Sequence, residues 1–264
     1  MAAIIYANLS DSGTVTASSW IAAAPPSMVQ NHHVSRRWKG QAGNAEWLLL
    51  DLGALTSIDT VAVFGIQGIF GDTQSNLSAL ALTRVRISTV DATGNAGNAH
   101  DSTSVAGRIR DSYGALVYLL TTPVSGRYVK IDISESTASA ILAGRLVVGL
   151  RNLFTINFSF GWGFGYVDLS RKKKSAGGQT FIARDDRYRV LTASFETLVE
   201  ADRYAFVHDA DRLNGISQDV LFMINTASSQ PDRDSVWGLM QDMTPPTQPN
   251  PSFFQKQYVI EERL

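Results

Sequence analysis

Five residues near the N-terminal end carry side chains suited to recognising sugars or anions. They are His32, His33, Arg36, Arg37 and Trp38, which share one short polar stretch. Guanidinium groups donate forked hydrogen bonds to carboxylates and hydroxyls, and an indole offers a flat face for stacking on a sugar ring. The alternative interpretation is a polar surface loop, with Trp38 in the core. We take these five residues as candidates for binding a glycan or an acidic partner.

The same histidines do not predict a metal site. Adjacent side chains in an extended segment point to opposite faces, so His32 and His33 form a poor chelating pair unless the loop bends. The chain has no cysteine, which excludes thiolate metal sites, disulfides and a cysteine nucleophile. Glycines at 161, 163 and 165 alternate with aromatic residues and lack the spacing of a dinucleotide-binding loop. We therefore expect no metal and no cofactor.

The densest run of charge is Arg171-Lys172-Lys173-Lys174. A solvated hairpin tip is one interpretation of this run. The other is an electrostatic contact with an acidic surface of a neighbouring subunit or with nucleic acid. The net charge of the chain is only −1, which argues against a nucleic-acid partner. We therefore take these four residues as candidates for a contact between subunits.

Signatures of catalysis are missing from the sequence. It contains no Gly-x-Ser-x-Gly, no His-Glu-x-x-His, no phosphate-binding loop and no calcium-loop spacing. A glycan-processing enzyme would need two carboxylates about 5 to 9.5 Å apart in one cleft. Asp185, Asp186, Asp209 and Asp211 are available, but their spacing does not single them out. We expect that the chain is not an enzyme.

Most of the elements that must position these residues are strands. The segment 47–53 is almost entirely apolar and ends in Asp-Leu-Gly, which predicts a buried strand followed by a turn. In 126–133, Val129, Ile131 and Ile133 alternate with polar residues, as in a half-buried strand, and we expect it to belong with 47–53. Segments 83–90, 116–120 and 141–149 predict further strands. The first 150 residues therefore predict a β-sandwich.

The second half predicts an α+β unit with a mostly antiparallel sheet. Strands are expected within 154–166 and at 187–195, 220–224, 237–240 and 253–261. Thr197-Leu-Val-Glu200 has the form of a capping box and predicts one helix that ends near Asn214-Gly215. With 264 residues, the chain is long enough for two such units, 1–150 and 151–264. We expect a mainly β protein with these two domains.

Two motifs carry a first family resemblance. The order Trp47-Leu48-x-x-Asp51-Leu52-Gly53, then apolar residues at 58, 61 and 63, then Arg127-Tyr-Val-Lys-Ile131 resembles the discoidin or coagulation-factor C-type domain. The resemblance implies a jelly-roll sandwich of the galactose-binding-like class. Members of that class bind glycans, lipid head groups or proteins through loops at one end, and 31–38 corresponds to part of that end.

A second resemblance covers most of 144–264. Gly144-Arg145-Leu146, Asn157-Phe-Ser159, Asp168-Leu-Ser170, Gly177-Gly178 and the terminal Ile260-Glu-Glu262 occur in an order that resembles the tail proteins of long-tailed bacteriophages, of the distal-tail or baseplate class. The resemblance implies a ring at the tail end with a carbohydrate-binding-like appendage. It transfers no functional residue to this chain.

These observations lead to one functional hypothesis and one alternative. We expect a structural component of a bacteriophage tail tip or baseplate, which forms a ring-shaped adaptor and can carry a carbohydrate-binding module. Its expected partners are copies of itself, neighbouring tail proteins and a host surface glycan. The alternative is a free bacterial lectin-like protein. No apolar run approaches the ~18 residues that span a bilayer, and the first residues do not resemble a secretory signal. We therefore expect a virion protein made in the host cytoplasm.

Overall fold

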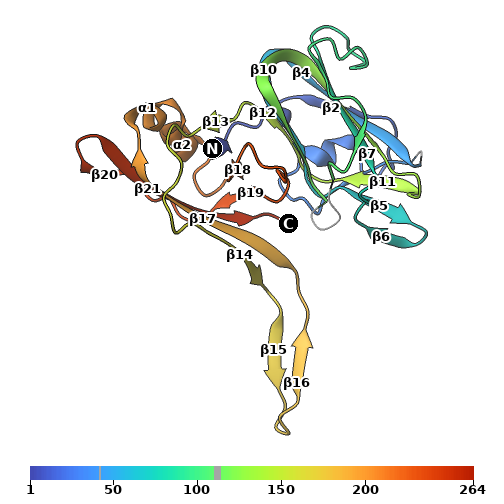
Figure 1. The fold of residues 1–264 in the computed structure, drawn as a ribbon. Coiled ribbons are helices and arrows are strands. Elements are labelled where there is room, and N and C mark those ends of the chain that lie inside the picture. Colours follow the sequence, from blue (N-terminus) through green and yellow to red (C-terminus); the bar gives the residue numbers. More distant parts are fainter. Residues whose placement is uncertain (42, 110–113) are drawn as a thin grey trace.

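The protein is mainly β, as predicted, with a β-sandwich followed by a mostly antiparallel β unit that carries one helical segment (Figure 1). The computed structural model describes residues 1–41, 43–109 and 114–264. Within these ranges, none of the helices is both long enough and apolar enough to cross a membrane.

Two sheets stack in the N-terminal sandwich. The larger sheet has the order β12-β4-β10-β7-β8, with β2 added to β4 and β9 added to β7. Its strands are β2 (Thr14–Ala17), β4 (Ala45–Val63), β7 (Leu82–Ser88), β8 (His100–Asp101), β9 (Val105–Ala106), β10 (Leu116–Ser134) and β12 (Leu146–Gly149). The smaller sheet has the order β3-β11-β5-β6, from β3 (Trp38–Lys39), β11 (Ala140–Ala143), β5 (Gln67–Phe70) and β6 (Thr73–Ser75). Short 3-10 turns at Leu9–Asp11 and Pro26–Gln30 complete this unit.

The two segments that were expected to belong together are neighbouring antiparallel strands. Ile131 lies opposite Leu48, and Val129 lies opposite Leu50. Ile131 and Val129 are both fully buried in the sandwich core, as their alternation with polar residues predicts. The predicted turn after Asp51 does not end the strand, because β4 continues through Gly53 to Val63. Gly53 has a φ of 76°, which a residue without Cβ adopts readily.

The strand predicted for 141–149 is two strands in different sheets. β11 ends at Ala143 and β12 begins at Leu146, with Gly144 and Arg145 between them. A Cβ on Gly144 would lie 2.4 Å from the carbonyl oxygen of Val34, so the backbone passes too close there for any side chain. By contrast, the strands predicted at 116–120 and 126–133 merge into β10, which pairs with β4 along most of its length.

The C-terminal unit is built on a second large sheet. Its order is β13-β1-β18-β19-β21-β17-β14, with β20 added to β21. The strands are β1 (Ala3–Ile5), β13 (Asn152–Leu153), β14 (Gly163–Asp168), β17 (Arg187–Leu198), β18 (Val220–Met223), β19 (Ser235–Met240), β20 (Thr247–Asn250) and β21 (Phe253–Glu262). β1 lies in this sheet, so the first strand of the chain belongs to the second unit. The division at residue 150 otherwise stays a prediction.

The helical segment begins later than predicted. α1 (Glu200–Asp202), a π-helical turn (Arg203–Val207) and α2 (His208–Leu213) follow one another without a break. Val199 is the N-cap and makes no side-chain capping bond, so the predicted capping box at Thr197 does not form. The reason is that Leu198 still belongs to β17 and pairs with Phe254.

A shared apolar layer fixes the two units together. The sandwich contributes Ala62, Phe64 and Val147, and the second sheet contributes Ile5, Leu221, Met223 and Trp237, all buried in one cluster. The rings of Phe64 and Trp237 stack with their centroids 6.4 Å apart. The burial of these side chains favours a single fixed arrangement of the two units.

An arm projects from the C-terminal unit (Figure 1). It starts where β14 and β17 leave the body, and it ends in the hairpin of β15 (Arg171–Lys174) and β16 (Thr180–Ala183). Every residue of this hairpin is exposed.

Candidate binding and assembly surfaces

The structure corrects the predicted role of Trp38. Its side chain is 0% exposed and lies in the sandwich core. The indole Nε1 donates a hydrogen bond of 2.9 Å to the carbonyl oxygen of Ser19. Because β3 pairs with β11, the ring faces the inside of the sandwich. Trp38 therefore cannot serve as a stacking plate for a ligand, and the alternative assignment to the core is the correct one.

The two histidines of the candidate stretch face the C-terminal unit. His32 Nδ1 lies 2.6 Å from Asp219 Oδ2, and the carboxylate of Asp219 is fully buried. Arg263 Nη1 donates to the other oxygen of this carboxylate at 2.9 Å. His33 Nε2 is 3.4 Å from Arg263 Nη2. These contacts assign His32 and Asp219 to the junction between the units, where a buried charge needs partners from both sides.

Arg37 is the member of the predicted set that remains suited to binding a ligand. Arg36 is exposed, whereas Arg37 is half-buried. Within the described residues, Nε of Arg37 is buried without a hydrogen-bond partner, and burial lowers the pKa of its guanidinium. The side chain lines a cleft of about 400 Å³, with Gln67 and Asn76 on the sandwich side and Glu262 and Arg263 on the other.

The predicted basic run forms one strand of the arm hairpin. Arg171, Lys172, Lys173 and Lys174 make up β15 and are exposed. The turn that follows is closed by Gly178, whose N–H donates 3.0 Å to the carbonyl oxygen of Ser175. The interpretation of a solvated hairpin is therefore right about its local structure. The assignment of these four residues to a subunit contact stays a prediction.

An ion pair holds the base of the arm. Arg187 Nε lies 2.9 Å from Asp168 Oδ2, across the β14–β17 pair. Ser170 also donates to this carboxylate through its backbone N–H. Hydrogen bonds from Ser170 and then from Arg187 lower the pKa of Asp168 to about 2. Asp168 and Ser170 come from the Asp-x-Ser motif of the sequence, so this motif shapes the start of the arm.

Apolar side chains are exposed along the same arm. Phe181 is 59% exposed and Ile182 is 57% exposed, both on β16. Tyr166, Val167 and Leu169 add further exposed apolar surface nearer the base. Soluble monomeric proteins rarely gather exposed apolar residues in this way, and such patches commonly mark interaction sites.

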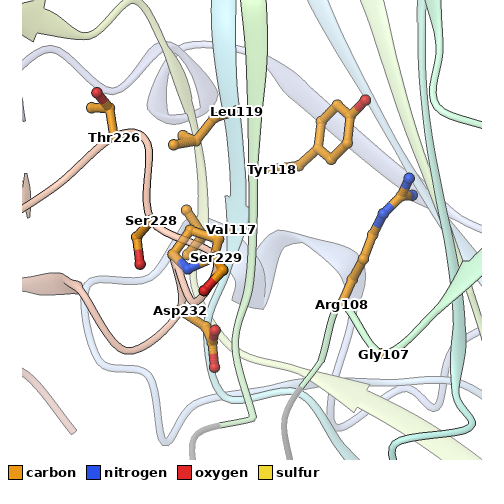
Figure 2. A pocket seen from close by; sticks show the side chains of 10 residues that line it. Gly107, Arg108, Val117, Tyr118, Leu119, Thr226, Ser228, Ser229 and Asp232 are labelled. Carbon is orange, nitrogen blue, oxygen red and sulfur yellow. The ribbon is translucent and has the colours of Figure 1, made fainter.

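A second cleft lies between the sandwich and the loop at 226–232 (Figure 2). Its volume is about 310 Å³, and its walls include Arg108 and Tyr118 on one side and Thr226 and Ser228 on the other. The guanidinium of Arg108 lies 4.9 Å from the centre of the Tyr118 ring, and Tyr118 Oη is 2.8 Å from His100 Nε2. The sequence alone did not indicate this cleft, because its walls are more than 100 residues apart.

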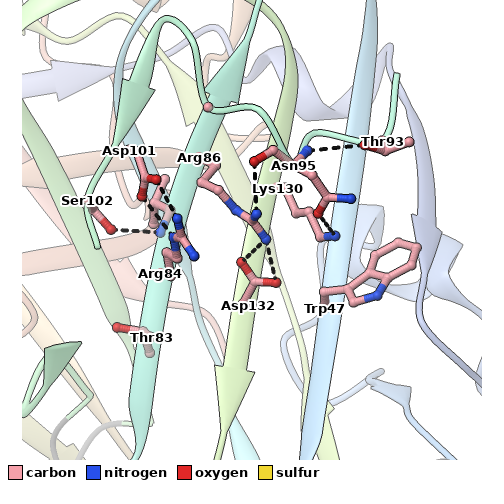
Figure 3. A network of polar contacts seen from close by, with 12 residues as sticks. Trp47, Thr83, Arg84, Arg86, Thr93, Asn95, Asp101, Ser102, Lys130 and Asp132 are labelled. Atoms are coloured by element: carbon pink, nitrogen blue, oxygen red, sulfur yellow. Dashed lines mark hydrogen bonds and ion pairs between the residues drawn. The ribbon is translucent and has the colours of Figure 1, made fainter. Parts of the chain in front are cut away.

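The outer face of the larger sandwich sheet carries a network of polar contacts (Figure 3). Arg86 Nη2 contacts both carboxylate oxygens of Asp132, at 2.9 and 2.7 Å. Lys130 Nζ donates 2.7 Å to Asn95 Oδ1 and lies 4.5 Å from the centre of the Trp47 ring. The network attaches the loop at 91–98 to the sheet and is therefore structural.

Two of the carboxylates considered for catalysis pair with different cations. Asp209 lies 3.2 Å from Arg212, whereas Asp211 lies 2.8 Å from Lys256. Asp185 and Asp186 are exposed at the arm base. In the described ranges, no group of three or more histidine, aspartate or glutamate side chains is placed to hold a metal ion.

No protein-family model matches the chain, and no curated protein matches it. Solved structures similar to it include the lectin domain of lectinolysin complexed with Lewis b antigen, with 14% identity and a TM-score of 0.41 over 54% of this chain and 96% of that one. A fucose-binding module of Streptococcus pneumoniae has 12% identity and a TM-score of 0.39 over 55% and 98% of the two chains. Chitosan-binding module 1 of a Paenibacillus sp. IK-5 chitosanase/glucanase has 17% identity and a TM-score of 0.42 over 55% and 99%.

Proposed function

We propose that this chain is a structural component of a bacteriophage tail tip or baseplate, and that it assembles with copies of itself through the arm. The observation that carries the proposal is the arm itself. Its hairpin is wholly exposed and combines the basic strand Arg171–Lys174 with the apolar side chains of Phe181 and Ile182. A free monomer would leave this apolar surface in water, and burying it against another protein is favourable.

The exposed arm of the molecule allows identical copies to join into a ring. The arm is a thin hairpin, whereas the body is two packed β units (Figure 1). When an arm contacts a different surface on the next copy, the contact is head-to-tail, and such contacts close into rings when the rotation between copies allows it. A closed ring is the assembly that we propose for this chain.

The positions of the motif residues support assignment to the tail-protein class. Asp168 and Arg187 pair at the base of the arm, and Gly178 closes the hairpin turn. Arg145 is fully buried and lies between Asp11 and the ring of Trp237, where the units join. The motifs that resemble tail proteins thus lie where the arm and the junction are built.

The experiment that tests the proposal is electron microscopy of purified phage particles, with this chain labelled and sought in the density of the tail tip. Labelled chain at the tail tip in ring-like density is the expected result. Particles that lack the chain altogether would overturn the proposal.

A second function, carbohydrate binding by the sandwich, is favoured by the cleft beside Arg37. A guanidinium whose Nε has no partner among the described residues can donate to a ligand hydroxyl or carboxylate. Glycan binding should be lost in Arg37→Ala and kept in Arg36→Ala, since Arg36 lies outside the lining of the cleft. Equal binding by both variants would rule out this site. Binding by a chain that never associates with particles would favour the lectin-like alternative.

A further inference from the structure

Arg37 differs from the other two arginines that line its cleft, because its guanidinium has no partner. Arg263 Nη1 donates 2.9 Å to Asp219 Oδ1, and Arg187 Nε donates 2.9 Å to Asp168 Oδ2. Within the described ranges, no hydrogen bond or ion pair engages the guanidinium of Arg37. One cation of the cleft is therefore left to pair with a ligand.

Burial makes this lack of a partner costly. Nε of Arg37 is buried, and the backbone of Gly65 lies close to it, since a Cβ on Gly65 would be 3.2 Å from that nitrogen. Taking a charge out of water costs free energy unless an opposite charge or hydrogen-bond acceptors replace the water. The same cost lowers the pKa of the Arg37 guanidinium. An anion bound in the cleft would offset it.

The carboxylates around the cleft do not supply that anion. Glu262 accepts 2.8 Å from Arg189 Nε and 2.9 Å from the N–H of the same residue, so its charge is already compensated. Asp186 is exposed, and no ion pair joins Arg37 to Asp186 or to the last residue, Leu264. Among the described residues none provides the negative charge, so a ligand is left to provide it.

The sandwich side of the cleft offers groups that suit sugar hydroxyls. Gln67 Nε2 donates 3.2 Å to Asn76 Oδ1. A side-chain amide has two N–H donors and a carbonyl with two lone pairs, so this bond leaves further hydrogen-bonding capacity at both residues. Ser35 adds a hydroxyl to the lining. The volume of about 400 Å³ lies within the roughly 300–1,000 Å³ of small-molecule sites.

We propose that this cleft binds a sugar that bears a carboxylate, such as a uronic acid, with the carboxylate on Arg37 and hydroxyls toward Gln67 and Asn76. The inference rests on the proposed carbohydrate binding and specifies the class of sugar. The site is composite, because these three residues come from the sandwich, whereas Glu262 and Arg263 come from the end of β21 and the residue after it. A guanidinium binds a carboxylate with two parallel hydrogen bonds, which adds specificity to the charge attraction.

Calorimetric titration of the full-length chain with matched sugars tests the class of ligand. Methyl glucuronide and methyl glucoside differ only in a carboxylate in place of a hydroxymethyl group, and methyl galacturonide and methyl galactoside form a second such pair. We expect the acidic member of at least one pair to bind at least about tenfold more tightly, because charge-assisted hydrogen bonds are the stronger ones. Acetate that binds as tightly as the acidic sugars would overturn the proposal.

Arg37→Gln removes the positive charge and keeps an amide donor. In this variant the acidic sugar should bind no more tightly than its neutral partner. Arg36→Gln is the matched control and should keep the preference, because Arg36 is exposed and lies outside the lining. The Arg37 variant should fold, since its guanidinium has no partner to lose, and thermal unfolding checks this. An equal preference in both variants would overturn the proposal.

A change in the C-terminal unit tests the composite nature of the site. Asp186→Asn removes a negative charge from the lining and should tighten binding of the acidic sugar about twofold, as expected for an exposed charge, without affecting the neutral sugar. Asp185→Asn is the control, because Asp185 is exposed and does not line the cleft. Indistinguishable affinities in these two variants would contradict a site that both units build.

Failure of this inference can be told apart from failure of carbohydrate binding itself. If the wild type binds acidic and neutral sugars equally and Arg37→Ala binds neither, the class of sugar is wrong and carbohydrate binding in the cleft stands. If neither matched pair, nor any acidic or neutral glycan on an array, binds the wild type, both proposals are wrong.

Discussion

His32 and Asp219 connect the two halves of the molecule through a 2.6 Å contact between Nδ1 and Oδ2. The carboxylate of Asp219 is fully buried, and Arg263 contacts its second oxygen. A residue expected to bind ligand is thus part of the structure that fixes the sandwich against the C-terminal unit. The orientation of the arm relative to the sandwich depends on this junction.

Asp219→Asn should destabilise the protein by about 2 kcal/mol. The substitution keeps the size of the side chain but removes the charge that accepts from His32 and Arg263, and breaking one side of a buried pair is costly. The free energy of unfolding in urea measures the effect. Asp72→Asn is the control, because Asp72 is exposed. Equal stability of both variants would show that the junction does not depend on Asp219.

Arg145→Met should cost roughly 3 kcal/mol, because it removes a buried cation from an established set of partners. Arg145 is 0% exposed, lies 2.6 Å from Asp11 and has its guanidinium 4.9 Å from the centre of the Trp237 ring. Burial lowers the pKa of this guanidinium despite the charge of Asp11. Thermal unfolding is the measurement, with the exposed Arg36→Met as the control. No difference between the two variants would contradict this assignment.

Some of these relationships could be predicted from the sequence, and others could not. The alternation of Val129, Ile131 and Ile133 is local information, and it placed a strand beside 47–53 correctly. The partners of His32 and Arg145 come from segments more than 100 residues away, so no spacing rule indicates them. β1 is only three residues long, and its place in the second sheet is set entirely by pairing with β13 and β18.

At the candidate site, too, local patterns were predictable from the sequence and long-range contacts were not. Trp38 is surrounded by polar neighbours in the sequence, but its pairing with β11 turns the ring into the core. The basic run was correctly placed on a hairpin, because charge density and the following Gly-Gly are local signals. The exposure of Phe181 and Ile182 on the facing strand could not be predicted, since a strand with consecutive large apolar residues is usually buried.

Low pH should remove the contribution of Asp101 to stability. Hydrogen bonds from Arg84, and then from the N–H of Thr103, lower the pKa of Asp101 from its ordinary value of 3.8 to about 2. The contribution of a carboxyl whose pKa is lowered by folding is fully present above about pH 4 and is lost as pH falls toward 2. The stability difference between wild type and Asp101→Asn should therefore shrink between pH 5 and pH 2. A stability difference between the two proteins that stays constant from pH 5 to pH 2 would contradict the prediction.

Two glycine substitutions should differ sharply in effect. A Cβ on Gly238 would lie 1.8 Å from the carbonyl oxygen of Glu261, on the neighbouring strand. Gly163 has no described atom within 4 Å of its Cβ position. We expect Gly238→Ala to cost several kcal/mol and Gly163→Ala to change the free energy of unfolding by less than about 1 kcal/mol. Similar denaturation midpoints for the two variants would contradict the close approach of β21 to Gly238 of β19.

The mass of the full-length chain in solution, measured by light scattering over a range of concentrations, tests the central claim of assembly through the arm most directly. We expect the wild type to reach a fixed multiple of the single-chain mass. Phe181→Ser/Ile182→Ser should stay at the single-chain mass while remaining folded by circular dichroism. Leu80→Ser is the matched control, because Leu80 is 79% exposed but lies on the sandwich, and it should assemble like the wild type. A wild type that stays monomeric, or an arm variant that assembles normally, would contradict the claim.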